Sequence, residues 1–246
     1  VQSGRGRGDG QGVDGGVWGA LWSRLAPTGP PQVAGREVLV VGVAVVVVVF
    51  VPVAWRLVRV GVTLVHELGH AFVGVACGRR FTGFVLRSDM SGHAVTVGRA
   101  RGFGRVATTW AGYPMPGLVA ALLAWVAGTG YAALAVAVAL VLLVVALPRV
   151  RSGLTFVVVA LVGAGLAALW WWRVDRVQAQ VLLGVAGVLL VGGWRHLGAV
   201  LAAGSGPGSD PGALRQLTGI PALVWNATFA MVLGGATWVL WRVLIG

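Results

Sequence analysis

The chain has 246 residues, of which 57% are hydrophobic and 11% are charged, and its formal net charge is +12 at pH 7. An ordinary soluble domain carries about 25% charged residues, so this composition excludes that class and favours a polytopic membrane protein. The basic residues are all arginine and are spread over successive loops, which favours contacts with acidic lipid headgroups over nucleic-acid binding. The single cysteine, Cys77, excludes an internal disulfide and a cysteine-rich metal cluster.

The beginning of the chain differs from the rest in composition. Residues 1–35 are rich in glycine, arginine and proline and are predicted to form a disordered tail, followed by a membrane domain over residues 36–246. An unbroken apolar run at residues 38–55 predicts the first membrane-spanning helix, and residues 57–77 are long enough for the second.

A more polar stretch follows at residues 78–104. Two β-prone segments, residues 81–86 and 93–97, flank a turn-like segment and predict a β-hairpin at the membrane surface. Its edge could hold an unwound peptide by strand addition, with Phe84 and Leu86 as candidate substrate contacts. A hairpin that only rests on the membrane surface is the alternative interpretation.

The remaining chain predicts five more spans, about seven in all, so the expected fold class is an all-α polytopic membrane protein with one hairpin between the second and third spans. Pro114 and Pro116 are expected to kink the third span. The later spans are expected at residues 105–128, 130–147, 153–172, 177–203 and 222–244. Counting arginines in the loops places the N-terminus in the cytoplasm and the C-terminus outside.

The second predicted span contains His66-Glu67-Leu68-Gly69-His70, the pattern HExxH. Residues four apart on a helix share a face, so His66 and His70 can reach one metal ion, for which zinc is the natural choice. Glu67 suits the base that takes a proton from the attacking water. A charged residue inside a span costs roughly 2.5–3.5 kcal/mol on insertion scales, which favours a functional role. The arginine count places this motif in the cytoplasmic half of its helix.

A catalytic zinc site needs a third protein ligand. Asp210 is the preferred candidate because it precedes the last span on the cytoplasmic side, where the hairpin is also expected to lie. Since Pro211 follows it, Asp210 equally suits the N-cap of a helix. His196, Asp89 and His93 remain open as alternative ligands.

The order of these motifs resembles the membrane-embedded M50 zinc metalloproteases, the site-2 protease class, and more closely their compact M50B-like branch of actinobacteria. The resemblance implies a bacterial cell-membrane protein in which two histidines and an aspartate from a later helix hold zinc. Two departures are the missing Asp-Gly metal motif and Gly212, which stands where a second aspartate is expected. The similar pieces lie within residues 60–225 and include HExxH, Gly112-Tyr113-Pro114-Met115-Pro116, Ser209-Asp210 and Leu217-Thr218-Gly219-Ile220-Pro221.

The sequence therefore predicts a zinc-dependent endopeptidase that cleaves a membrane-protein or peptide substrate within or beside the lipid bilayer, without a nucleic-acid partner. A catalytically degenerate relative that binds zinc as a scaffold or regulator is the alternative. A metal transporter is a third possibility, but transporters distribute acidic and histidine ligands over several spans, and most spans expected here carry none.

Overall fold

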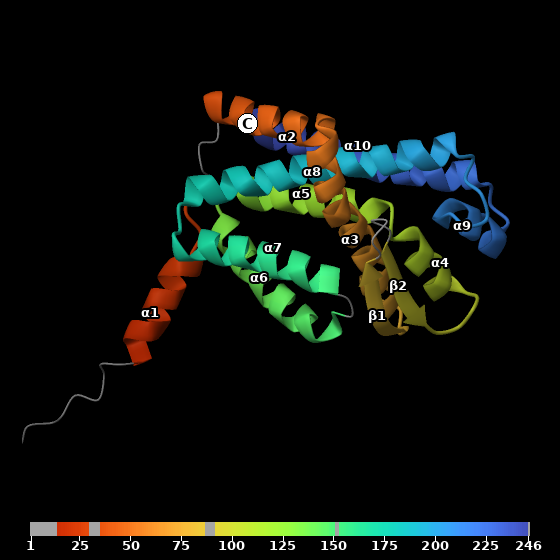
Figure 1. Cartoon of the computed structure of the whole chain (residues 1–246), viewed down its shortest axis with the longest axis horizontal. Helices are drawn as coiled ribbons and strands as arrows, with labels where there is room; N and C mark the ends of the chain where they lie inside the picture. The colour runs from red at the N-terminus through yellow and green to blue at the C-terminus, as the bar shows by residue number, and fades with distance from the viewer. Residues whose placement is uncertain (1–13, 30–34, 87–91, 151–152, 246) are drawn as a thin grey trace, which may run out of the picture.

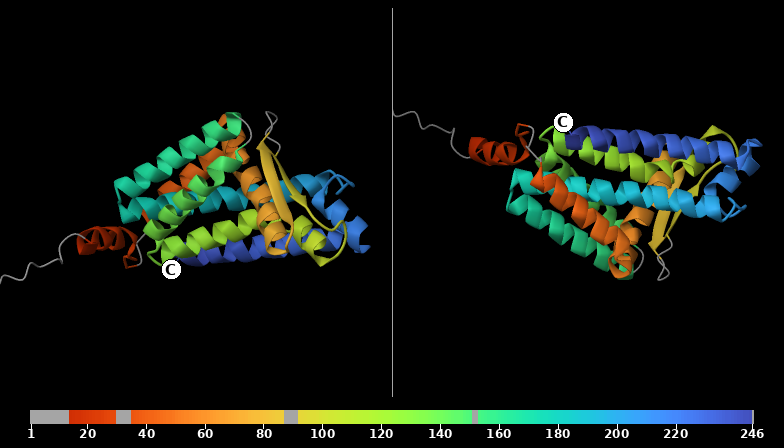
Figure 2. Two further views of the ribbon diagram at one scale, coloured as in Figure 1. Left: turned by 90° about the horizontal axis from the view of Figure 1, so that it is seen from below. Right: turned by 90° about the horizontal axis from the view of Figure 1, so that it is seen from above.

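Three helices form the centre of the molecule in the computed structural model, which describes residues 14–29, 35–86, 92–150 and 153–245 (Figure 1). They are α5 (Pro114–Gly128), α8 (Asp175–Ala202) and α10 (Ala222–Ile245), and they lie side by side in both views of Figure 2. Gly117 of α5 and Gly193 of α8 both pack against Leu233 of α10, where an added Cβ would lie 2.9 and 2.8 Å from a Leu233 methyl carbon. Small residues at such contacts let membrane helices approach closely.

The two predicted N-terminal spans form a bent pair in the structure. Helix α2 (Arg36–Phe50) and helix α3 (Pro52–Ala76) meet at an angle of 97°. Pro52 lacks a backbone N–H and its ring clashes with the preceding turn, so the helix breaks before it. Arg195 of α8 supports the bend by donating a hydrogen bond to the Val49 carbonyl at 2.9 Å while lying 4.1 Å from the centre of the Trp55 ring.

A second bend interrupts the third predicted span. Helix α4 (Phe103–Trp110) and helix α5 are inclined at 64° on the two sides of residues 111–113. The bend occurs where Pro114 begins α5, which agrees with the kink expected there.

The structure supports fewer candidate membrane spans than the sequence predicted. Among the described residues, α8 and α10 are each long and apolar enough to cross a membrane, and the two bent pairs raise the number to four if each crosses as one span. Helix α6 (Ala132–Ala146) and the stretch Phe156–Trp171 of helix α7 (Gly153–Trp171) are apolar but shorter. These helices give two to four candidate spans and do not clearly show the seven that were expected, because the first two predicted spans form one bent pair and α6 and the counted stretch of α7 are short.

The predicted hairpin is present. Strand β1 (Arg80–Leu86) pairs antiparallel with β2 (Gly92–Val97), and the register has an irregularity between Phe81 and Gly83. The connecting residues 87–91 lie outside the described part of the chain. Buried Arg79 fixes the base of the hairpin by donating a 2.7 Å hydrogen bond to the Arg99 carbonyl.

Part of the predicted tail forms helix α1 (Asp14–Leu25). Arg24 donates hydrogen bonds to the Trp170 and Trp171 carbonyls at the end of α7, at 3.3 and 3.2 Å, and Arg173 donates one to the Ala26 carbonyl at 3.1 Å. These contacts hold the C-terminal end of α1 against the end of α7. Residues 1–13 and 30–34 lie outside the described residues, so the predicted tail boundary stays a prediction.

The molecule has two distinct ends. Helix α1 lies where α8 begins, whereas the hairpin, α4 and α9 (Asp210–Thr218) gather toward the end where α8 finishes (Figure 1). A helix of 28 residues is about 42 Å long, enough to separate the two ends across a bilayer. The predicted orientation, with the N-terminus and the HExxH region on the cytoplasmic side, stays a prediction.

Candidate metal centre

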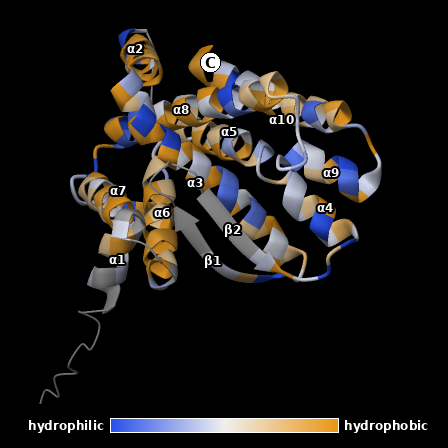
Figure 3. Cartoon of the chain, turned by 45° about the vertical axis from the view of Figure 1, so that its right-hand side comes forward, coloured by the Kyte–Doolittle hydropathy of each residue, from blue (hydrophilic) through white to orange (hydrophobic). Residues whose placement is uncertain are grey.

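The two motif histidines project from the same face of α3 toward the start of α9, in a region where hydrophilic residues recur on α3, α4 and α9 (Figure 3). Their helix packs closely against the break between α4 and α5. An added Cβ at Gly69 would lie 2.7 Å from the Ala111 carbonyl oxygen and 2.7 Å from the Met115 Cβ. The glycine inside the motif is therefore required for the close packing of α3.

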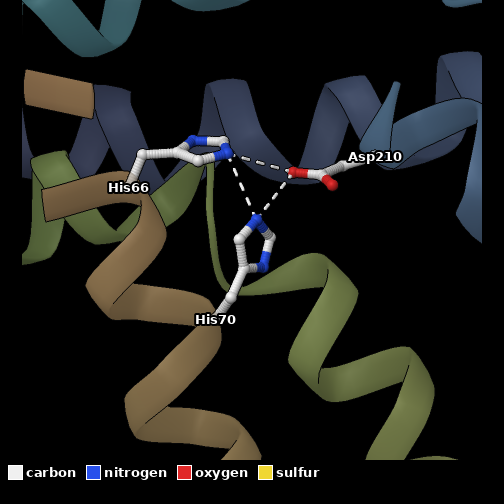
Figure 4. Close-up of side chains that lie close together, drawn as sticks. All are labelled: His66, His70 and Asp210. Atoms are coloured by element: carbon white, nitrogen blue, oxygen red, sulfur yellow. Dashed lines mark hydrogen bonds and ion pairs between the residues drawn. The ribbon is translucent and has the colours of Figure 1, made fainter. Parts of the chain in front are cut away.

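Asp210 reaches the histidines from a distant part of the chain. Its Oδ2 lies 3.3 Å from His66 Nε2 and 3.2 Å from His70 Nε2 (Figure 4). The two Nε2 atoms are 3.2 Å apart. These three atoms are close enough together to hold one metal ion. Burial opposes ionisation of Asp210, but the neighbouring imidazoles of His66 and His70 hold the pKa of its carboxyl below the ordinary value.

The residue that caps α9 is not the residue whose carboxylate faces the histidines. Ser209 is the N-cap, and its hydroxyl oxygen accepts a hydrogen bond from the Gly212 backbone N–H at 3.3 Å. Asp210 is therefore the first helical residue, and its side chain is left to face the histidines. Gly212 lies against the Gly206 carbonyl so closely that this loop has no room for a side chain there.

The orientation of His70 is set by the backbone of α4. Its Nδ1 lies 2.7 Å from the Thr108 carbonyl oxygen, which can only accept a hydrogen bond. Nδ1 therefore carries the proton, and in the neutral ring the lone pair of Nε2 points toward His66 and Asp210. This arrangement of a ring N–H on a backbone carbonyl is common for histidines that bind metals.

A glycine lies directly against the imidazole pair. An added Cβ at Gly112 would lie 2.5 Å from His70 Nε2 and 2.6 Å from His66 Nε2. Contacts this short would force the nitrogen atoms to move, so only glycine leaves space for them at this position.

A cavity of about 420 Å³ opens beside the three donor atoms. Glu67 and Tyr113 line it together with both histidines and Asp210. Its size suits a small ligand or a short peptide segment. Its wall is completed by Thr96, Arg105, Thr108, Thr109, Gly208, Ser209 and Ala213.

The other candidate ligands do not join this group. His196 lies nearby on α8, but its ring centre is 6.3 Å from that of His66, and it is not among the residues able to hold the ion. Asp89 lies outside the described residues, as does the side chain of His93. Geometry therefore favours Asp210 over the alternatives left open by the sequence.

The predicted substrate contacts are described only in part. Phe84 and Leu86 belong to β1 and pair with Ala94 and Gly92 of β2. Their side chains lie outside the described part of the structure, so their role stays a prediction.

Sequence reasoning did not assign roles to Thr108, Gly112 or Tyr113. The segment containing Gly112 and Tyr113 is one of the motifs that resemble the M50 family. That resemblance could have indicated that the segment lies near the metal centre. Thr108 acts through its backbone carbonyl, which leaves no signal in the residue type.

Comparison with known proteins agrees with the geometry. Residues 39–240 match the family model described as Peptidase M50B-like, whereas searches of curated proteins and of solved structures each found no match. The apolar helices and this family together indicate an integral membrane protein. Because the match covers most of the chain, including both histidines and Asp210, the protein belongs to the M50B-like family of membrane metallopeptidases.

Proposed function

We propose that the protein is a zinc-dependent endopeptidase that cleaves a membrane-protein or peptide substrate within or beside the bilayer. The supporting observation is the convergence of His66, His70 and Asp210, whose donor atoms are 3.2–3.3 Å apart. Tetrahedral zinc with bonds of 2.0–2.1 Å requires donor separations of about 3.3 Å. The side chains present therefore fit zinc.

The residues around this site match the needs of peptide hydrolysis. Zinc, when bound, supplies Lewis-acid chemistry that polarises a carbonyl and acidifies water. His66, His70 and Asp210 would hold the ion, and the Thr108 carbonyl keeps His70 in the required orientation. Glu67 lines the same cavity and would take a proton from the attacking water, then deliver it to the leaving amine.

The substrate must present an extended backbone, because the carbonyls of a helix are already hydrogen-bonded. We propose that the edge of the hairpin holds the unwound segment by strand addition, with Phe84 and Leu86 as contacts. The lipid bilayer is the second partner, since large apolar side chains are exposed on the outer faces of α2, α6 and α10. A scaffold that only binds zinc would not require a cavity lined by a base beside the ion, so this alternative is not favoured.

Replacing the base tests the enzyme directly. In the variant Glu67→Gln we expect cleavage of candidate membrane-protein substrates to fall about 10²–10⁴-fold, the usual contribution of general acid–base catalysis, with zinc content unchanged. The matched control is Glu37→Gln, because Glu37 pairs with Arg176 at 3.0 Å at the start of α8. Full cleavage by Glu67→Gln would overturn this assignment, and a zinc-loaded wild type that cleaves no peptide would support the scaffold.

A further inference from the structure

Tyr113 occupies a defined place between the hydrophobic core and the candidate metal centre. Its ring stacks on Phe229 with centres 5.1 Å apart and planes at 12°. The same ring meets His66 edge to face, with centres 4.9 Å apart. Phe229 is completely buried, and buried Pro114 follows Tyr113 in the chain, so the core fixes the position of the tyrosine ring.

The Tyr113 hydroxyl has no partner among the described residues. No hydrogen bond joins this hydroxyl to another described group, and its oxygen atom remains accessible to solvent. A tyrosine that is largely enclosed normally directs its hydroxyl to a hydrogen-bond partner. Since Tyr113 lines the cavity beside the metal-binding side chains, its partner would be a molecule within that cavity.

The other hydroxyl groups of the cavity wall are already engaged. Thr108 and Thr109 donate to the Gly104 and Arg105 carbonyls at 2.6 and 2.9 Å. The remaining two are Ser209, which donates to the Gly206 carbonyl at 2.7 Å, and Thr96, which accepts from Arg79 at 3.4 Å. Of these hydroxyl side chains, Tyr113 alone combines an uncommitted donor with a ring contact to a metal-binding imidazole.

We propose that the Tyr113 hydroxyl donates a hydrogen bond to the carbonyl oxygen of the scissile peptide bond. This inference rests on the proposed peptidase function. As water adds to the carbonyl carbon, the carbonyl oxygen gains negative charge. A hydrogen-bond donor already held in place by the protein stabilises that charge without reorganising. The stack on Phe229 supplies this preorganisation, which makes Tyr113 a catalytic residue alongside Glu67.

Tyr113→Phe removes the hydroxyl and keeps the ring, so the contacts with Phe229 and His66 remain. Loss of one such donor typically lowers kcat about 10²–10³-fold, and we expect a decrease of that size with KM, zinc content and melting temperature nearly unchanged. The control is Tyr131→Phe at the turn before α6, which we expect to match the wild type. Unchanged kcat in Tyr113→Phe, or a loss of zinc, would overturn the inference.

A binding measurement separates this inference from the proposed function. A phosphinic peptide carries charged oxygens in a tetrahedral arrangement, as the attacked carbonyl does. We expect Tyr113→Phe to bind it at least tenfold more weakly than the wild type, with equal affinity for a product peptide. If the wild type cleaves nothing but this difference persists, the peptidase function fails and the hydrogen-bond donor stands. Equal affinity of both proteins for the phosphinic peptide would refute the donor.

Discussion

The metal end and the α1 end of the molecule both contain charged side chains, but these side chains are satisfied in different ways. At the α1 end, Arg173 pairs with Asp175 at 2.8 Å, and Arg24 donates to backbone carbonyls of α7. At the metal end, two imidazole nitrogens and a carboxylate oxygen converge on one another, and buried His66 Nδ1 has no hydrogen-bond partner among the described residues. The α1 end is held by an ion pair and by hydrogen bonds to backbone carbonyls, whereas the metal end gathers three donor atoms that could hold a metal ion.

The strongest test of this contrast compares one aspartate from each end. Asp210→Ala removes a proposed zinc ligand, and we expect zinc affinity to fall more than about 100-fold, because loss of an outer-shell partner alone costs 10–100-fold. Asp175→Ala breaks the ion pair with Arg173 and should leave zinc binding unchanged. Zinc titration of both purified variants checks this, and equal affinities would remove Asp210 from the site.

A smaller effect is expected from a steric change beside the imidazoles. Gly112→Ala places a Cβ about 2.5 Å from His70 Nε2, so we expect weaker zinc binding, of the order of 10–100-fold, and a similar loss of cleavage. Gly61→Ala is the control, because nothing lies within 4 Å of a Cβ at that position of α3. This control should raise the melting temperature slightly, since alanine is favoured over glycine in helices by about 1 kcal/mol. Normal zinc affinity in Gly112→Ala would show that the break between α4 and α5 can yield.

The position of the two ends relative to the membrane can be examined with almost no perturbation. Cys77 is half-buried at the end of α3, near the hairpin, and Trp22 of α1 is exposed. We expect a membrane-impermeant maleimide to label Cys77 and a Cys77→Ser, Trp22→Cys variant from opposite sides of the bilayer. Labelling from the same side would show that α8 does not cross the membrane between them, and the result also assigns the orientation.

The sequence by itself determined that this is a membrane protein and identified His66 and His70 as two members of its candidate metal centre. Apolar runs indicate burial in lipid, alternating β-prone segments predict the hairpin, and a spacing of four places His66 and His70 on one helical face. All three are properties of neighbouring residues, so they can be read without knowing the path of the chain.

Only the tertiary structure decided how the distant segments meet. It brought Asp210 to the histidines and placed Arg195 of α8 against the bend between α2 and α3. It also placed Gly112 and Tyr113 against the same imidazoles. These outcomes depend on contacts between residues far apart in the chain, whose energies are set by packing of the helices rather than by local pattern.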